Sequence, residues 1–241
     1  IIKLETVYLK AKRKKPKART AAAAAAAPTT QDQSGWYEDA LVRFHKGDYQ
    51  GALIQLKNVL QENPTNLPAR VLLGQTYLRL GSPADAQKEL QAANNMGADE
   101  TLIIGFVAQA YLQQHRYKDV LEKILPVGRS DQVEATVLGA RATAYYELYR
   151  YEDALADFSS AHRLVPDDPV PLLGIARVLV RQGKIDEAIS QVNKAATLAP
   201  KHHDVWYVRG EIYKVNKEFE AARQSYSQCI ELVPAHFPAR I

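Results

Sequence analysis

Arg177 and Arg181 are spaced four residues apart in a stretch that predicts a helix, so their side chains lie on one face, one turn apart. Two guanidinium groups at this spacing could jointly hold a carboxylate through charge-assisted hydrogen bonds. The alternative is that both are solvated and pair with Glu147 or Glu211 of the same chain. In either case the chemistry that these residues offer is binding.

The sequence lacks the motifs that commonly mark an enzyme active site. The sequence has no GxSxG, HExxH, P-loop or CxxC motif. His202 and His203 are adjacent and point to different sides, so with Asp204 they are interpreted as a polar turn rather than a metal site. The single cysteine, Cys229, excludes an internal disulfide and is interpreted as a small buried residue rather than a catalytic thiol. We therefore predict a protein that is not an enzyme and has no cofactor and no bound metal.

The chain of 241 residues is internally repetitive. Six windows of 34 residues align without insertion or deletion, at 33–66, 67–100, 101–134, 135–168, 169–202 and 203–236. The eighth place is always small: Ala40, Gly74, Ala108, Ala142, Ala176 and Gly210. The twentieth place holds Ala52, Ala86, Val120, Ala154, Ala188 and Ala222. A register this strict predicts stacked repeats, which form extended surfaces rather than enclosed reaction chambers.

Each window predicts two helices separated by a turn. In the fifth, Asp168 caps the first helix, Pro169 starts it and Gly183 ends it, and a second helix runs from about Ile185. The small residues are expected where the two helices cross closely. Aromatic side chains are expected to fill the space between one pair and the next, at Tyr49, Tyr117, Tyr151, Phe219, Phe158 and Tyr226. In the third window Pro126 should shorten the second helix.

The series Trp206, Gly210, Tyr213, Ala222, Tyr226 and Pro234 resembles the tetratricopeptide repeat (TPR), and the other windows follow it across residues 33–236. The resemblance implies an all-α fold with essentially no strand, a right-handed α-solenoid of six TPR helix–turn–helix repeats. It also implies a scaffold for protein–protein interaction, in which the first helix of each pair lines a concave groove.

The inward places of these first helices predict a partner-binding groove for a protein or peptide segment. Its residues are Tyr37, Gln75, Leu78, Gln109, Leu112, Thr143, Tyr146, Arg177, Arg181, Tyr207 and Glu211. We expect the centre of the groove at the tyrosines and arginines of the last three windows, because aromatic and arginine side chains dominate binding energy on concave surfaces that exclude water.

The positive charge is concentrated at the N-terminus. The chain has a net charge of +4, but residues 1–32 hold eight basic side chains against two acidic ones, so the rest of the chain carries a net charge of −2. The alkaline pI therefore does not indicate a nucleic-acid-binding face on the repeats, and no nucleic-acid partner is expected. Residues 1–32, with a basic run and seven alanines, are interpreted as a flexible linker. A nuclear-localisation patch, a phosphate-binding arm or a juxtamembrane basic cluster are the alternatives. No apolar run is long enough to cross a membrane.

The C-terminal residues 237–241 repeat the opening of the second window, at residues 67–71. They are interpreted as the start of a truncated seventh repeat, so the chain is expected to be a fragment of a longer protein. Truncation there would expose an apolar edge around Ile230, Val233, Phe237 and Ile241, through which the chain could self-associate.

Residues 37–58, with Asn63 and Pro64, and residues 69–74 and 86–90 resemble the opening repeats of the TPR lipoproteins of the PEP-CTERM system. That resemblance implies a docking role in exopolysaccharide export or protein sorting in Gram-negative bacteria, with a periplasmic or outer-membrane location. The lipid-attachment cysteine of those proteins does not lie in this stretch.

Two alternatives are a subunit of a pilus or secretion machine and a cytosolic co-chaperone. Co-chaperones that bind the acidic C-terminus of heat-shock chaperones need a lysine and an asparagine one turn apart on an early first helix. The equivalent places hold Tyr37/Leu41, Val71/Gln75, Gly105/Gln109, Gly139/Thr143, Leu173/Arg177 and Tyr207/Glu211, so that carboxylate clamp is absent.

Overall fold

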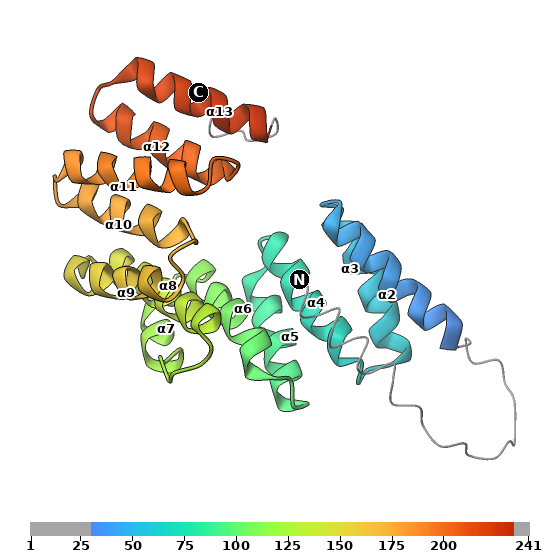
Figure 1. Cartoon of the computed structure of the whole chain (residues 1–241). Coiled ribbons are helices and arrows are strands. Elements are labelled where there is room, and N and C mark those ends of the chain that lie inside the picture. The colour runs from blue at the N-terminus through green and yellow to red at the C-terminus, as the bar shows by residue number, and fades with distance from the viewer. Residues whose placement is uncertain (1–29, 234–241) are drawn as a thin grey trace, which may run out of the picture. The chain divides into compact units, whose positions relative to one another are not determined.

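The computed structural model describes residues 30–233, and within that range every regular element is an α-helix (Figure 1). The first helices of the six pairs are α2 (Thr30–His45), α4 (Leu67–Arg79), α6 (Glu100–Gln113), α8 (Asp131–Glu147), α10 (Val170–Arg181) and α12 (His203–Val215). The second helices are α3 (Tyr49–Glu62), α5 (Pro83–Asn95), α7 (Tyr117–Lys123), α9 (Tyr151–Leu164), α11 (Ile185–Leu198) and α13 (Phe219–Leu232). The predicted all-α class, with six helix–turn–helix repeats, is confirmed.

The helices form two compact units, residues 1–116 and 117–241, of which 30–116 and 117–233 are described. In the first unit α2 to α6 pack in chain order, and in the second α7 to α13 do the same. Helix α2 begins at Thr30, inside the predicted linker 1–32. The basic run and the alanines of that linker, and the predicted truncated repeat at 237–241, lie outside the described residues and stay predictions.

The turn inside each pair has one backbone requirement that recurs in every repeat. The fifteenth place has a positive φ in all six windows, at Gly47, Gly81, His115, Tyr149, Gly183 and Lys217. A residue with a Cβ is disfavoured in this left-handed conformation, which explains why glycine occupies half of these places. Gly183 ends α10 as predicted, although that helix begins at Val170 because Pro169 takes the cap position itself.

The third repeat differs from the others as Pro126 predicts. Helix α7 has 7 residues, whereas the other second helices have 13 or 14. A guanidinium group from the next repeat bonds its last carbonyl groups: Arg141 Nη1 donates to the carbonyl oxygens of Leu121, at 3.0 Å, and Ile124, at 3.3 Å. Arg141 also lies 3.4 Å from a carboxylate oxygen of Asp157. The side chain therefore replaces part of the hydrogen bonding that a longer helix would supply.

The two helices of each repeat approach closely at the predicted small residues. All the alanines at the eighth place are fully buried, as are those at the twentieth except Ala222, which is 4% exposed. A Cβ on Gly74 would lie 2.8 Å from Leu90, and one on Gly210 would lie 2.5 Å from Tyr226. The glycines therefore stand where the facing side chain of the same repeat leaves no room even for a methyl group.

The aromatic side chains pack only partly as predicted. Phe158 is buried and lies against Gly174 of the following repeat, where a Cβ would be 2.4 Å from its ring. Phe219 is 66% exposed, so its predicted packing role is wrong. The equivalent Tyr49 makes its ring contact with Phe44 of its own repeat, at 5.4 Å between centroids. The sixth window has Lys214 where Phe44 stands in the first, so Phe219 lacks that aromatic partner.

Two glycines of the second unit allow a matched test of helix packing. Gly139→Ala, on α8, puts the new methyl group where no atom of another helix lies within 4 Å, so we expect a gain of about 0.5–1 kcal/mol in the free energy of unfolding. Gly174→Ala, on α10, overlaps the buried Phe158 ring and should cost about 1–3 kcal/mol. Urea denaturation measures both, and a stabilising Gly174→Ala would contradict the packing described.

Replacing Arg141 by leucine should destabilise the second unit by about 1–3 kcal/mol, because it removes hydrogen bonds to α7 and leaves Asp157 without its cation. Burial already raises the pKa of Asp157, and Arg141 opposes that rise. In the variant the pKa should rise further, so the cost is greatest at neutral pH and falls as pH drops through that pKa.

Denaturation of Arg141→Leu at several pH values checks this prediction, with Arg141→Leu/Asp157→Asn as the control. The double variant should be more stable than the single variant at pH 7 and should lose the pH dependence. Equal stability of the two variants would show that the Asp157 charge does not matter.

Candidate functional site

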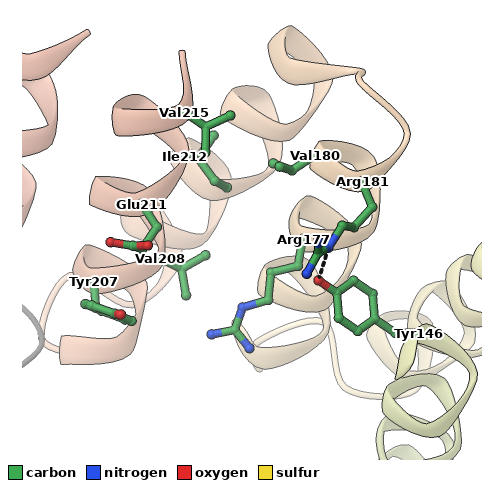
Figure 2. A pocket seen from close by; sticks show the side chains of 9 residues that line it. All are labelled: Tyr146, Arg177, Val180, Arg181, Tyr207, Val208, Glu211, Ile212 and Val215. Carbon is green, nitrogen blue, oxygen red and sulfur yellow. Dashed lines mark hydrogen bonds between the residues drawn. The ribbon is translucent and has the colours of Figure 1, made fainter. Parts of the chain in front are cut away.

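A cavity of about 560 Å³ lies in the second unit, on the first helices of the last three repeats (Figure 2). It is lined by Tyr146 of α8, by Val180 and two arginines of α10, and by five residues of α12. The polar lining residues are Tyr146, Arg177, Arg181, Tyr207 and Glu211. The structure thus brings together five of the eleven residues predicted for the groove.

Repetition explains why residues so distant in sequence meet. Tyr146 and Val180 occupy the twelfth place of consecutive windows, and Arg177 and Glu211 occupy the ninth. Equal places on stacked first helices face the same side, since each repeat packs on the next in the same way. Within one helix the spacing of four residues places Arg177 below Arg181 on a single face.

Arg181 is engaged within the protein. Its Nε donates a hydrogen bond of 2.9 Å to the hydroxyl oxygen of Tyr146, drawn as the dashed line in Figure 2. Its guanidinium carbon lies 5.8 Å from the centroid of the same ring, and the hydrogen bond raises the pKa of Arg181. The predicted alternative, an ion pair of Arg181 with Glu147 or Glu211, is therefore wrong, because a tyrosine from the neighbouring repeat takes that position.

Arg177 differs from Arg181 although the two are one turn apart. It is exposed, and in the described part of the chain it makes no hydrogen bond or ion pair. Figure 2 shows its side chain extending from α10 into the space toward α12. Its positive charge acts on Tyr207, whose pKa is raised by burial and by Glu211 and lowered in part by Arg177. The cation therefore faces the cavity with its donors available to a ligand.

Glu211 is the acidic group of the cavity, and it also has a partner. The hydroxyl of Tyr226, on α13, donates a hydrogen bond to its carboxylate. Partial burial raises the pKa of Tyr226, and the bond to Glu211 raises it further. This bond joins the two helices of the sixth repeat and fixes the carboxylate on the α12 wall of the cavity.

Apolar side chains form the rest of the lining. Val208 is 2% exposed and Ile212 is 3% exposed, whereas Val215 is 54% exposed, and Val180 is half-buried. Val208, Ile212 and Val215 were not among the predicted site residues. Val215 stands at the thirteenth place of its window, as Arg181 does in the preceding one, so the repeat register could have identified it.

The other six predicted residues do not line this cavity. Tyr37, Gln75 and Leu78 are at most 5% exposed, which corrects the expectation that they present a binding surface. Tyr37 packs in a core of α2, α3 and α4, and Leu78 packs against Ala86 and Ala110. The remaining three are exposed or half-buried but do not line this cavity: Gln109, Leu112 and Thr143.

The chemistry available at the cavity is binding by charge, hydrogen bonds and apolar contact. Within residues 30–233 no group of three or more His, Cys, Asp or Glu side chains is placed to hold a metal ion. Cys229 is fully buried, as predicted, and burial raises the pKa of its thiol. Among the described helices, none has the length and apolar character needed to cross a membrane.

Two family models, both described as tetratricopeptide repeat, match the chain. One matches residues 43–110 and 145–212, and the other matches residues 203–236. The matched residues make up more than half of the chain, and the structure has the helix pairs that the repeat requires. The chain belongs to the tetratricopeptide repeat family.

A curated relative is the human Tetratricopeptide repeat protein 7B, which is 34% identical over 64 residues, covering 27% of this chain and 8% of the relative. The chain therefore spans less than a tenth of that protein. The resemblance to PEP-CTERM-system lipoproteins is not confirmed by this relative and stays a prediction.

Solved structures show the same fold. PilF of Pseudomonas aeruginosa has a TM-score of 0.61 at 16% identity, over 87% of this chain and 96% of that one. PilW, described as a type IV pilus biogenesis factor, has a TM-score of 0.60 at 15% identity, over 88% and 98%. The Cut9–Hcn1 complex of the APC/C has a TM-score of 0.66 at 14% identity, over 86% and 41%. At these identities the likeness concerns the fold alone.

Arg177 should contribute little to stability, because it has no partner within the described residues. We expect Arg177→Gln to change the free energy of unfolding by less than about 0.5 kcal/mol. Leu173→Ala, at a buried position of the neighbouring core, serves as the positive control and should cost about 2–5 kcal/mol. Chemical denaturation measures both, and a cost above about 1.5 kcal/mol for Arg177→Gln would reveal a structural role.

Proposed function

We propose that this protein is a non-catalytic scaffold that binds a segment of a partner protein in the cavity formed by α8, α10 and α12. The TPR fold itself indicates an interaction module. The observation that carries the proposal is the convergence of Tyr146, Arg177 and Tyr207, from three successive repeats, on one cavity with a buried aliphatic floor.

This composition suits a protein partner. Tyrosine and arginine side chains give binding energy when they surround a pocket from which water is excluded, and the truncation of one such residue commonly costs more than about 1 kcal/mol. A nucleic-acid ligand is disfavoured because Glu211 contributes a fixed negative charge to the wall. The occupant is therefore a protein or peptide segment.

For the biological setting we propose the bacterial cell envelope, in exopolysaccharide export or protein sorting. The support is the resemblance of residues 37–58 and 69–74 to the PEP-CTERM-system TPR lipoproteins. A pilus or secretion-machine subunit is the alternative within the envelope, and a co-chaperone without the carboxylate clamp is the alternative in the cytosol. The partner that is captured distinguishes these settings.

The test is quantitative affinity capture from cells of the source organism with the wild type and Tyr146→Ala/Arg177→Ala/Tyr207→Ala. The control is Lys194→Ala, an exposed position on α11 that removes the same charge. Circular dichroism of each variant must show the helicity of the wild type. We expect at least one partner to be retained by Lys194→Ala and lost, by about tenfold or more, from the triple variant.

Loss of envelope or polysaccharide-export proteins would support the proposed setting, and loss of a major heat-shock chaperone would favour the co-chaperone. An identical set of partners from the wild type and the triple variant would place the binding surface elsewhere on the chain.

A further inference from the structure

The chemistry of the cavity restricts which class of partner segment can bind there. This inference rests on the proposed function. We infer that the bound segment carries an aspartate or glutamate side chain, which binds Arg177, next to an aliphatic side chain, which packs on Val180, Ile212 and Val215.

Arg177 contrasts with other arginines that lie between helices. Arg70 forms an ion pair of 2.7 Å with Glu89. Arg209 donates to Asn193, at 2.8 Å, and to a serine of α13. Arg177 has no such partner in the described part of the chain, yet its side chain extends across a cavity rather than away from the protein (Figure 2).

Two other polar groups of the cavity are engaged with residues other than Arg177. The carboxylate of Glu211 accepts a hydrogen bond from Tyr226, and the hydroxyl of Tyr146 accepts one from Arg181. Both groups are held by these bonds on opposite walls, away from the guanidinium of Arg177. An anion that satisfies the Arg177 donors must therefore come from the ligand, and the planar carboxylate matches the guanidinium in a bidentate pair.

The charges that line the cavity distinguish between a carboxylate and a phosphate as the ligand group. Arg181 donates its Nε–H to Tyr146 and keeps its positive charge, and Glu211 adds a negative charge to the same cavity, so the charged side chains of the lining, Arg177, Arg181 and Glu211, sum to +1. A dianionic phosphate would be repelled by Glu211 more strongly than a carboxylate with a single charge. The balance of charge therefore favours an acidic side chain over a phosphorylated one.

An apolar surface lies beside Arg177 in the same cavity. Val215 is 54% exposed at the rim, above the buried Val208 and Ile212, and Val180 borders the same space from α10. An aliphatic side chain placed here would remove apolar surface of both partners from water. Exclusion of water by that contact would in turn strengthen the ion pair at Arg177.

The experiment uses three synthetic 15-residue peptides that share one pattern of Leu and Ser and carry Glu, Gln or Lys at the remaining places. Acetylated and amidated ends remove the terminal charges. Fluorescence polarisation with the whole chain should give binding of the Glu peptide at least about tenfold tighter than that of the Gln peptide, with the Lys peptide weakest. The preference for Glu should weaken as the salt concentration rises.

Arg177→Gln should abolish the preference for Glu over Gln, whereas Lys194→Gln, which removes the same charge on α11, should keep it. Titration of the Glu peptide should also shift the Nε–Hε NMR signal of Arg177. A preference that survives Arg177→Gln, equal affinity for the Glu and Gln peptides, or no binding of any peptide would each overturn the inference. If a cellular partner is nevertheless lost from the triple variant, the proposed groove function stands and only the acidic partner class fails.

Discussion

The close approach of the two helices inside each repeat is the constraint on which the rest of the structure depends. Their backbones come near enough that the eighth place is alanine or glycine in every repeat. Gly74 faces Leu90 and Gly210 faces Tyr226, in each case without room for a methyl group. Because the same contact recurs every 34 residues, the first helices keep a constant orientation within each unit. Within a unit, residues at the same place of successive windows therefore lie at corresponding positions on the surface.

Much of the fold could be predicted from this periodicity. The small residues, the turn at Gly183 and the shortening of α7 before Pro126 each follow from local rules of backbone conformation and packing. The packing of an aromatic side chain is harder to predict, because it depends on which residue stands at a second place. Phe219 occupies the same place as Tyr49, but only Tyr49 has a phenylalanine beside it in its own repeat.

The site was predictable in position and much less so in its interactions. Five predicted residues converge because their places in the window are fixed. Their partners are not fixed by the register, since Arg181 bonds Tyr146 and the carboxylate of Glu211 bonds a tyrosine that the sequence presents as a packing residue. The burial of Tyr37, Gln75 and Leu78 was not predicted, for a related reason. The pattern defines an inward side for Tyr37, but it does not tell how much of that side the neighbouring helices cover.

The short helix α7 has a practical consequence for anyone who divides this chain into pieces. The repeat of the sequence runs from 101 to 134 and includes both α6 and α7, yet the compact units separate after residue 116, so α7 is grouped with α8. The carbonyl groups at the end of α7 accept hydrogen bonds from Arg141, which belongs to the following repeat. A piece of the chain that ends at the repeat boundary would therefore keep α7 and lose the side chain that completes it. The period of the sequence and the cooperative unit of folding are offset here by one helix.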